Sequence, residues 1–126
     1  MTTRPRVVIL GGGIGGIKAA QQLANQPVDV LIIDHNNYQV FQPLLYQVAT
    51  SMLSTDEVVY PIRAFFKKAA NVDFMLAEVN GIQPEAKVVK TSHGDVAYDY
   101  LIIALGSTPN FFGNQEVERN ALPLKT

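Results

Sequence analysis

The chain has 126 residues, of which 48% are hydrophobic and 17% charged, a composition that fits one folded domain and counts against disorder. Its formal net charge is −1, and the short basic pair Lys67-Lys68 does not provide the cationic surface that nucleic acid requires. The chain contains no cysteine, which excludes disulfides, thiolate metal sites and dithiol redox chemistry within these residues.

The start of the chain superficially resembles a signal peptide, because Arg4 and Arg6 precede an apolar run over residues 7–17. Five of these eleven residues are glycine, which makes a poor hydrophobic helix. The run is also shorter than the roughly 20 residues that cross a bilayer. We therefore expect no signal peptide and a cytoplasmic protein.

A βαβ unit is predicted at the start of the chain. Residues 6–10 predict a strand, because after Arg6 they form an unbroken apolar run that ends at glycine, the pattern of a strand buried on both faces in a parallel sheet. From Ile14 the apolar residues recur with helical spacing until Pro27 closes the segment. Residues 28–33 are again rich in β-branched residues, in a nearly unbroken apolar run, and predict a second parallel strand.

The middle of the chain is less regular. A turn cluster at residues 35–37 is followed by an apolar segment over residues 41–53 without clear periodicity, a pattern often found lining a site. Pro61 suits the first turn of a helix. The inward-facing residues of that helix would be Ile62, Phe65, Phe66 and Ala69. Residues 72–79 predict a third parallel strand.

Residues 87–91 and 96–100 predict two short antiparallel strands joined by a turn. Residues 101–105 then predict a buried strand that ends at Gly106, and no further element is evident after Pro109. The predicted fold is α/β: a Rossmann-like parallel sheet with helices on its faces and an antiparallel β insertion. Residues 1–126 would form one dinucleotide-binding domain.

A glycine-rich motif follows the first predicted strand. Gly11, Gly13 and Gly16 satisfy G-x-G-x-x-G and open the first predicted helix, the context that makes this pattern specific. Gly11 would make the tight turn, Gly13 would let a pyrophosphate approach the backbone, and Gly16 would let helix and strand pack closely. Backbone N–H groups and the helix dipole would bind the anion without a lysine.

An acidic residue stands where this fingerprint expects one. Asp34 ends the second predicted strand, 23 residues after Gly11, and its carboxylate would accept hydrogen bonds from ribose hydroxyls. A carboxylate would repel a 2′-phosphate, so the nucleotide would be FAD or NAD and not NADP. His35 and His93 are isolated in turns and are interpreted as surface residues. The sequence offers neither a metal cluster nor a nucleophile triad.

Two longer segments resemble one family. Residues 34–50, with the core Phe-Gln-Pro-Leu-Leu-Tyr-Gln-Val-Ala, are similar to the stretch after the second strand in type II NADH dehydrogenases. Residues 98–113 resemble the second flavin motif of that family, with Leu105 where threonine is usual. The resemblance covers essentially the whole chain, but only about the first quarter to third of a family member.

The resemblance implies that the chain is the FAD-binding portion of a flavoprotein oxidoreductase that passes electrons from NADH through FAD to a quinone. It implies a cofactor site built from the fingerprint, the start of the irregular segment and the last strand, and assigns no catalytic residue. The implied site residues are Gly11, Gly12, Gly13, Ile14, Gly15, Gly16, Asp34, His35, Pro43, Leu44, Leu45, Val79, Ala104, Leu105 and Gly106.

Several expectations about partners accompany this resemblance. A second, NADH-binding domain would lie outside these residues, so this chain alone would be inactive and would tend to self-associate. Membrane association would be peripheral, on the inner face, through a region outside these residues. Disulfide reductases of this architecture carry a Cys-x4-Cys pair that is missing here, and sulfide:quinone reductases are disfavoured for the same reason. A nucleotide-binding sensor module without redox activity remains an alternative.

Overall fold

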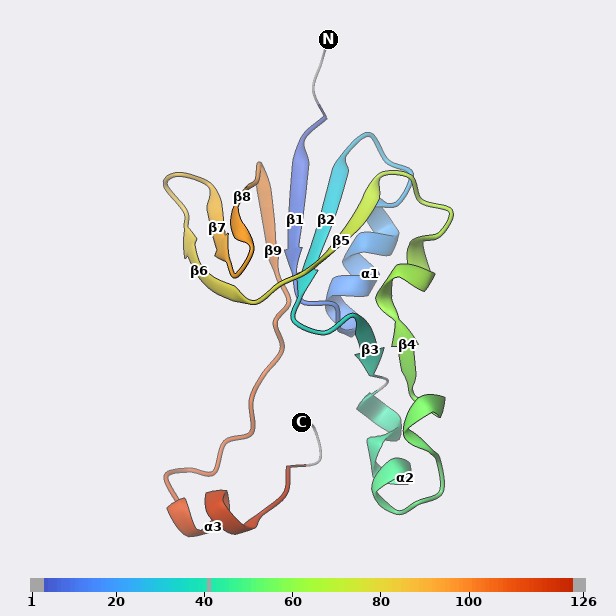
Figure 1. Cartoon of the computed structure of the whole chain (residues 1–126), viewed down its shortest axis with the longest axis vertical. Helices are drawn as coiled ribbons and strands as arrows, with labels where there is room; N and C mark the ends of the chain where they lie inside the picture. The colour runs from blue at the N-terminus through green and yellow to red at the C-terminus, as the bar shows by residue number, and fades with distance from the viewer. Residues whose placement is uncertain (1–3, 41, 124–126) are drawn as a thin grey trace.

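The computed structural model describes residues 4–40 and 42–123 (Figure 1). Its centre is a parallel sheet with the strand order β5-β2-β1-β9. The strands are β1 (Arg6–Leu10), β2 (Asp29–Asp34), β5 (Val72–Leu76) and β9 (Tyr100–Ile103). Every neighbouring pair is parallel, and this order is that of one half of a Rossmann sheet. The predicted fold class is confirmed.

The two faces of this sheet pack against different layers. Val7 and Ile9 of β1 lie in a core with helix α1 (Ile14–Leu23) and the 3-10 helix η3 (Ile62–Phe66). Val8 and Leu10, which point to the other face, pack against the antiparallel sheet. Because both faces are covered, β1 carries an unbroken run of apolar residues instead of an alternating one.

The antiparallel sheet has the order β6-β7-β8, formed by β6 (Val79–Gln83), β7 (Val88–Thr91) and β8 (Gly94–Ala97). The predicted insertion is present, but the prediction of one strand over residues 72–79 is wrong. β5 ends at Leu76, and β6 begins at Val79 in a different sheet. The apolar pattern runs through both strands because each of them is packed in the core.

An arm formed by residues 38–61 leaves the carboxyl-terminal edge of the parallel sheet (Figure 1). β3 (Tyr38–Val40) pairs antiparallel with β4 (Val59–Pro61) at its base. Between them lie η1 (Gln42–Leu44), α2 (Leu45–Ala49) and η2 (Thr55–Glu57). The hairpin was not predicted, because three-residue strands are too short for a periodic pattern. Phe41, which begins the predicted apolar segment, lies outside the described residues.

The helix predicted after Pro61 is the 3-10 helix η3. Ile62 and Phe66 are buried as expected. Phe65 and Ala69 are partly buried and pack against the same core. The inward-facing set is therefore confirmed, although the helix is a tighter and shorter type than an α-helix.

Two expectations for the end of the chain are wrong. β9 is an edge strand with Tyr100 and Ile103 more than 60% exposed, so it is not buried on both faces. Helix α3 (Gln115–Asn120) follows Pro109, where no element was expected. Asn114 caps it, because Oδ1 of Asn114 accepts from the Val117 N–H at 3.1 Å. Within the described part of the chain, no helix is both long and apolar enough to span a bilayer.

Candidate dinucleotide-binding site

The glycine loop lies between β1 and α1 at the carboxyl-terminal edge of the parallel sheet. Gly11 has a φ of +105°, and a Cβ atom there would overlap the carbonyl oxygen of Ala104. The Gly11 N–H donates to the Ile33 carbonyl at 2.8 Å, which fixes the turn against β2. A side chain at this position would meet both a strained backbone and an occupied space.

Gly16 brings helix and strand together at the other end of the loop. A Cβ atom on Gly16 would overlap the carbonyl oxygen of Gly11 and would lie 3.4 Å from Cγ2 of Ile9. The structure therefore has the close helix–strand approach for which the fingerprint places its third glycine.

The middle of the loop faces outward. Gly13 is exposed, and a Cβ atom there would meet nothing within 4 Å. Gly13 is also the N-cap of α1, and no side chain caps this end of the helix. Free N–H groups and the positive end of the helix dipole thus face a space that a side chain would fill. This arrangement fits a pyrophosphate.

Asp34 ends β2 beside the loop, with its side chain 16% exposed. Its Oδ2 accepts from the Gly12 N–H at 2.6 Å, and its Oδ1 accepts from the Asn36 N–H at 2.9 Å. An ionised carboxylate has about four acceptor positions, so capacity remains for ribose hydroxyls. His35 is exposed, with Nδ1 3.3 Å from Oδ1 of Asp34. The link from Asp34 to Gly12 was not anticipated from the sequence.

The end of β9 completes this edge. The Ala104 N–H donates to the Leu10 carbonyl at 2.8 Å, and the Ala104 carbonyl faces Gly11. Gly106 has a φ of +79° as the chain turns away from the sheet. From β1 the chain continues to β2 and β5 on one side, whereas β9 lies on the other side of β1. Such a switch in strand order is where open α/β sheets bind their ligands.

The structure brings the glycine loop, Asp34 and Ala104 together. Other predicted site residues lie outside this cluster, on the arm and at the start of β6. Pro43, Leu44 and Leu45 lie in η1 and α2, on the arm beyond β3 and β4 (Figure 1). Val79 opens β6 two residues after Ala77, whose N–H donates to the Asp34 carbonyl at 3.0 Å. The backbone near Val79 is therefore tied to the end of β2.

Ile62 is a contact residue of the loop that sequence reasoning assigned only to the core. A Cβ atom on Gly12 would overlap Cδ1 of Ile62. One signal in the sequence could have indicated a close neighbour of the loop: position 12 is glycine, although G-x-G-x-x-G leaves the residue type at this position open.

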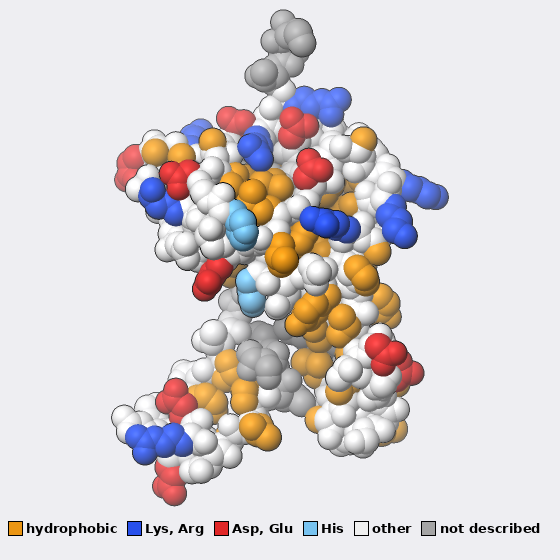
Figure 2. Space-filling view, viewed as in Figure 1, with side chains coloured by type: hydrophobic (Ala, Val, Ile, Leu, Met, Phe, Trp, Pro, Cys, Tyr) orange, Lys and Arg blue, Asp and Glu red, His pale blue; other side chains and the backbone are white. Residues whose placement is uncertain are grey.

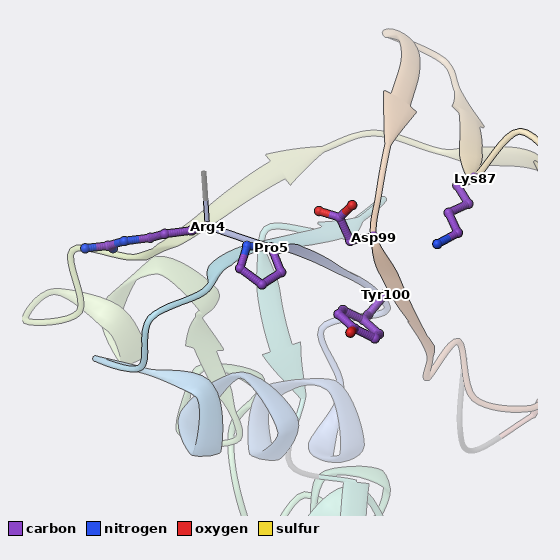
Figure 3. Close-up of a pocket in the computed structure, with 5 residues that line it drawn as sticks. All are labelled: Arg4, Pro5, Lys87, Asp99 and Tyr100. Carbon is purple, nitrogen blue, oxygen red and sulfur yellow. The ribbon is translucent and has the colours of Figure 1, made fainter. Parts of the chain in front are cut away.

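A separate open pocket lies at the opposite edge of the sheet (Figure 3). It has a volume of about 340 Å³ and is lined by Arg4, Pro5, Lys87, Asp99 and Tyr100. Tyr100 begins β9, so this pocket faces the amino-terminal ends of the strands. Ligands of such sheets bind outside the carboxyl ends, and the pocket is therefore not the candidate site.

Other polar groups lie away from the loop. A hydrogen bond from the Ser54 hydroxyl, together with a backbone hydrogen bond, lowers the pKa of the exposed Asp56 carboxyl. Asp56 belongs to η2 on the arm. Among residues 4–40 and 42–123, no group of three or more His, Cys, Asp or Glu side chains is placed to hold a metal ion.

Comparison with known proteins identifies the family. Residues 5–125 match the family model of the pyridine nucleotide-disulphide oxidoreductases. The chain belongs to this family. The match covers the glycine loop, Asp34 and the end of β9 together, so the geometry described above is that of a pyridine nucleotide-disulphide oxidoreductase.

Within this family, the chain is similar to type II NADH:quinone oxidoreductases. The chain is 40% identical over 98% of its length to the type II NADH:quinone oxidoreductase NdhA of Mycobacterium tuberculosis, and covers 27% of that protein. It matches NDH2 of Plasmodium falciparum, solved in complex with NADH, with a TM-score of 0.83 and 28% identity, over 92% of this chain and 25% of that one. The chain thus spans about a quarter of the length of these relatives.

A further match is the sulfide:quinone oxidoreductase of Aquifex aeolicus, with a TM-score of 0.77 and 30% identity. This match covers 89% of the chain and 27% of the solved protein. The similarity to type II NADH dehydrogenases, which residues 34–50 and 98–113 predicted, is confirmed by the matches to proteins of that name.

Proposed function

We propose that this chain is the FAD-binding portion of a flavoprotein oxidoreductase that passes electrons from NADH through FAD to a quinone. One observation carries the proposal: an open glycine loop and Asp34 meet at the switch point of a parallel sheet. The similarity of nearly the whole chain to type II NADH:quinone oxidoreductases supports the choice of FAD and of this reaction.

The residues have distinct tasks in this proposal. The loop from Gly11 to Gly16 holds the FAD pyrophosphate through backbone N–H groups, and Asp34 accepts from the adenosine ribose. By likeness to the family, residues 43–45 and 104–106 lie along the flavin, and the backbone at Val79 lies near the adenine. Bound FAD supplies the capacity to accept a hydride from NADH. The protein orients the cofactor, so no acid–base pair is required.

The remaining parts of the activity are assigned to residues outside this chain. Residues 1–126 form one FAD-binding domain, and a second domain binds NADH. The longer protein acts on a quinone as a peripheral protein on the inner face of the membrane. These assignments are supported by the likeness to type II enzymes, of which this chain covers about a quarter.

A direct test is titration of the cofactor-free chain with FAD and, separately, with NAD. We expect FAD to bind near stoichiometry and to give the chain a flavin absorbance spectrum in the visible range. A colourless chain that binds NAD and ignores FAD would contradict the proposal and would support the alternative of a nucleotide-binding sensor module, which needs the loop and Asp34 but no flavin segment.

The likeness to the Aquifex aeolicus protein favours a second candidate, a sulfide:quinone reductase-like flavoprotein. Both candidates use FAD at the same loop and differ in the electron donor. The absence of cysteine from these residues counts against the second. Bleaching of the flavin absorbance by sulfide, in an anaerobic sample of the FAD-loaded chain, would favour it over the first.

A further inference from the structure

Gly12 lies between two side chains that come from different parts of the chain. A Cβ atom at this position would overlap Cδ1 of Ile62 and would lie 3.2 Å from Oδ2 of Asp34. Asp34 is the last residue of β2, whereas Ile62 is the first residue of η3 and follows the arm in the sequence. Three separate segments therefore meet at the second residue of the glycine loop.

The backbone conformation does not explain why position 12 is glycine. Gly12 is absent from the residues with positive φ, and the fingerprint leaves this position open. An alanine there would be excluded mainly by the Ile62 methyl group. The other nearest atoms, Oδ2 of Asp34 and Cγ1 of Ile62, lie at 3.2 and 3.4 Å, which small adjustments can accommodate.

Ile62 is itself held firmly in place. Its side chain is fully buried, and its N–H donates to the Asn37 carbonyl at 3.0 Å. Asn37 follows closely after Asp34, so Ile62 is anchored to the segment that carries the acidic residue. A close-packed side chain on a fixed backbone limits the movement of its neighbours. The methyl group of Ile62 thus fills the space beside Gly12 on the side where its Cβ would point, next to Oδ2 of Asp34.

We propose that Ile62 is a positioning residue for dinucleotide binding: its Cδ1 methyl fills the space beside Gly12 and Oδ2 of Asp34, fixes Gly12 in the conformation in which its N–H donates to Asp34, and so sets the direction of the loop N–H groups. The inference rests on the proposed function. It also assigns a second task to η3, whose Ile62 packs in the core with the parallel sheet and at the same time contacts the glycine loop at Gly12.

Ile62→Val tests the proposal, because it removes Cδ1 and leaves the rest of the side chain. Ile32→Val is the matched control, since Ile32 is also fully buried, lies in the same core cluster and loses the same methyl group. We expect Ile62→Val to raise the FAD dissociation constant about two- to thirtyfold, the range for residues coupled to a site through packing. The control should leave this constant within about twofold.

In a second experiment, the effect of Ile62→Val on FAD affinity should change sign: the substitution weakens binding in the wild-type chain but improves binding when residue 12 is alanine. Gly12→Ala alone should weaken FAD binding and lower the unfolding temperature of the cofactor-free chain. Adding Ile62→Val removes the overlapping atom, so the double variant should bind FAD more tightly and melt at a higher temperature than Gly12→Ala. Adding Ile32→Val instead should restore neither. If Gly12→Ala does not fold, a recovered cooperative melt in the double variant supports the proposal equally.

The outcomes separate the two claims. A wild-type chain that binds neither FAD nor NAD overturns the proposed function and this inference with it. A wild-type chain that binds FAD, with Ile62→Val and Ile32→Val indistinguishable in affinity and no rescue of Gly12→Ala, overturns the inference alone. If Ile62→Val lowers the stability of the chain but does not improve FAD binding by Gly12→Ala, Ile62 is an ordinary core residue.

Discussion

A Cβ atom on Gly16 would overlap the carbonyl oxygen of Gly11, five residues earlier in the chain. Helix α1 can therefore start this close to β1 only if position 16 is glycine. Gly13, three residues before Gly16, has open space instead. The loop thus combines a glycine that the fold requires with one that only a ligand would require.

We predict that Gly13→Val keeps the fold and loses FAD. The valine side chain would stand where the pyrophosphate approaches the loop, and its Cβ would have no protein atom within 4 Å. We expect FAD affinity to fall by about 2 kcal/mol or more, roughly thirtyfold, because hydrogen bonds to a charged group are lost. Fluorescence titration measures the affinity, and circular dichroism measures the fold.

Gly81→Val is the matched control, since a Cβ atom at Gly81 also meets nothing within 4 Å and the residue lies in β6, away from the loop. It should bind FAD normally. Gly16→Ala should show the opposite behaviour to Gly13→Val and lose stability by about 3 kcal/mol. Undiminished FAD binding by a folded Gly13→Val chain would mean that the loop is only structural.

The second prediction concerns Asp34. Asp34→Ala should weaken FAD binding by about 1 to 3 kcal/mol, because polar partners lose a charged acceptor. The cofactor-free chain should also become less stable, since the Gly12 and Asn36 N–H groups lose the same carboxylate. Asp73→Ala, at an exposed acid on β5, is the control and should change neither property. An unchanged FAD dissociation constant for Asp34→Ala would remove this residue from the site.

A third prediction concerns the turn between α1 and β2. Nδ2 of Asn71 donates to three carbonyls, those of Leu23, Gln26 and Val28, and Oδ1 accepts from the Asn25 N–H. Asn71 is buried, so Asn71→Leu would remove all four of these hydrogen bonds. The Leu23 and Gln26 carbonyls keep backbone N–H donors, whereas the Val28 carbonyl and the Asn25 N–H lose the partner that the Asn71 side chain gives them. We expect a loss of about 3 kcal/mol in the free energy of unfolding, measured by urea denaturation.

Asn120 provides the comparison for Asn71. Its Nδ2 also donates to a backbone carbonyl, that of Glu116 at 2.9 Å, but the residue is exposed at the end of α3. Asn120→Leu should therefore change stability by no more than about 0.5 kcal/mol. Equal losses at both positions would show that burial of Asn71 does not determine its contribution.

The parts of this fold that could be predicted are those in which local pattern and tertiary packing agree. β1 is buried on both faces and is followed directly by the glycine loop. The hydrophobic run and the glycines of the turn therefore both indicated a buried strand that ends in a tight turn. The β3–β4 hairpin and the six-residue helix α3 are too short for a periodic signal. α3 did carry a local sign in its N-cap Asn114, which propensity reasoning overlooked.

The candidate site also contains residues that the sequence could predict and one that it could not. Gly11, Gly16 and Asp34 could be placed because the fingerprint encodes a local turn and a fixed spacing. The contact of Ile62 with Gly12 joins residues 50 positions apart in the sequence and depends on how η3 packs on the sheet. No local pattern encodes such a contact, and only the packed structure reveals it.

A fourth prediction is that the isolated chain self-associates. Large apolar side chains are exposed on the arm and around α3 (Figure 2), among them Phe112 at 90% and Leu122 at 96% exposure. Exposed apolar patches favour association. The sequence also indicated Phe111 and Leu124 as apolar residues without a partner after the last strand. Phe111 is partly buried, and Leu124 lies outside the described residues. Sedimentation velocity should show a mass that rises with concentration, and Phe112→Ser with Leu122→Ser should reduce this rise. A concentration-independent monomer would contradict the prediction.

The last prediction is that these 126 residues alone do not sustain NADH:quinone turnover. The chain carries one glycine fingerprint, and hydride transfer requires nicotinamide and flavin to be fixed within near-contact distance. One Rossmann unit that already holds FAD offers no second site of this kind for NADH. NADH oxidation with a soluble quinone, followed by absorbance, should therefore stay at the rate of free FAD. The FAD-loaded chain is the sample to use, so that an inactive result is not caused by a missing cofactor. Robust turnover by a monomer would mean that these residues form a complete small enzyme.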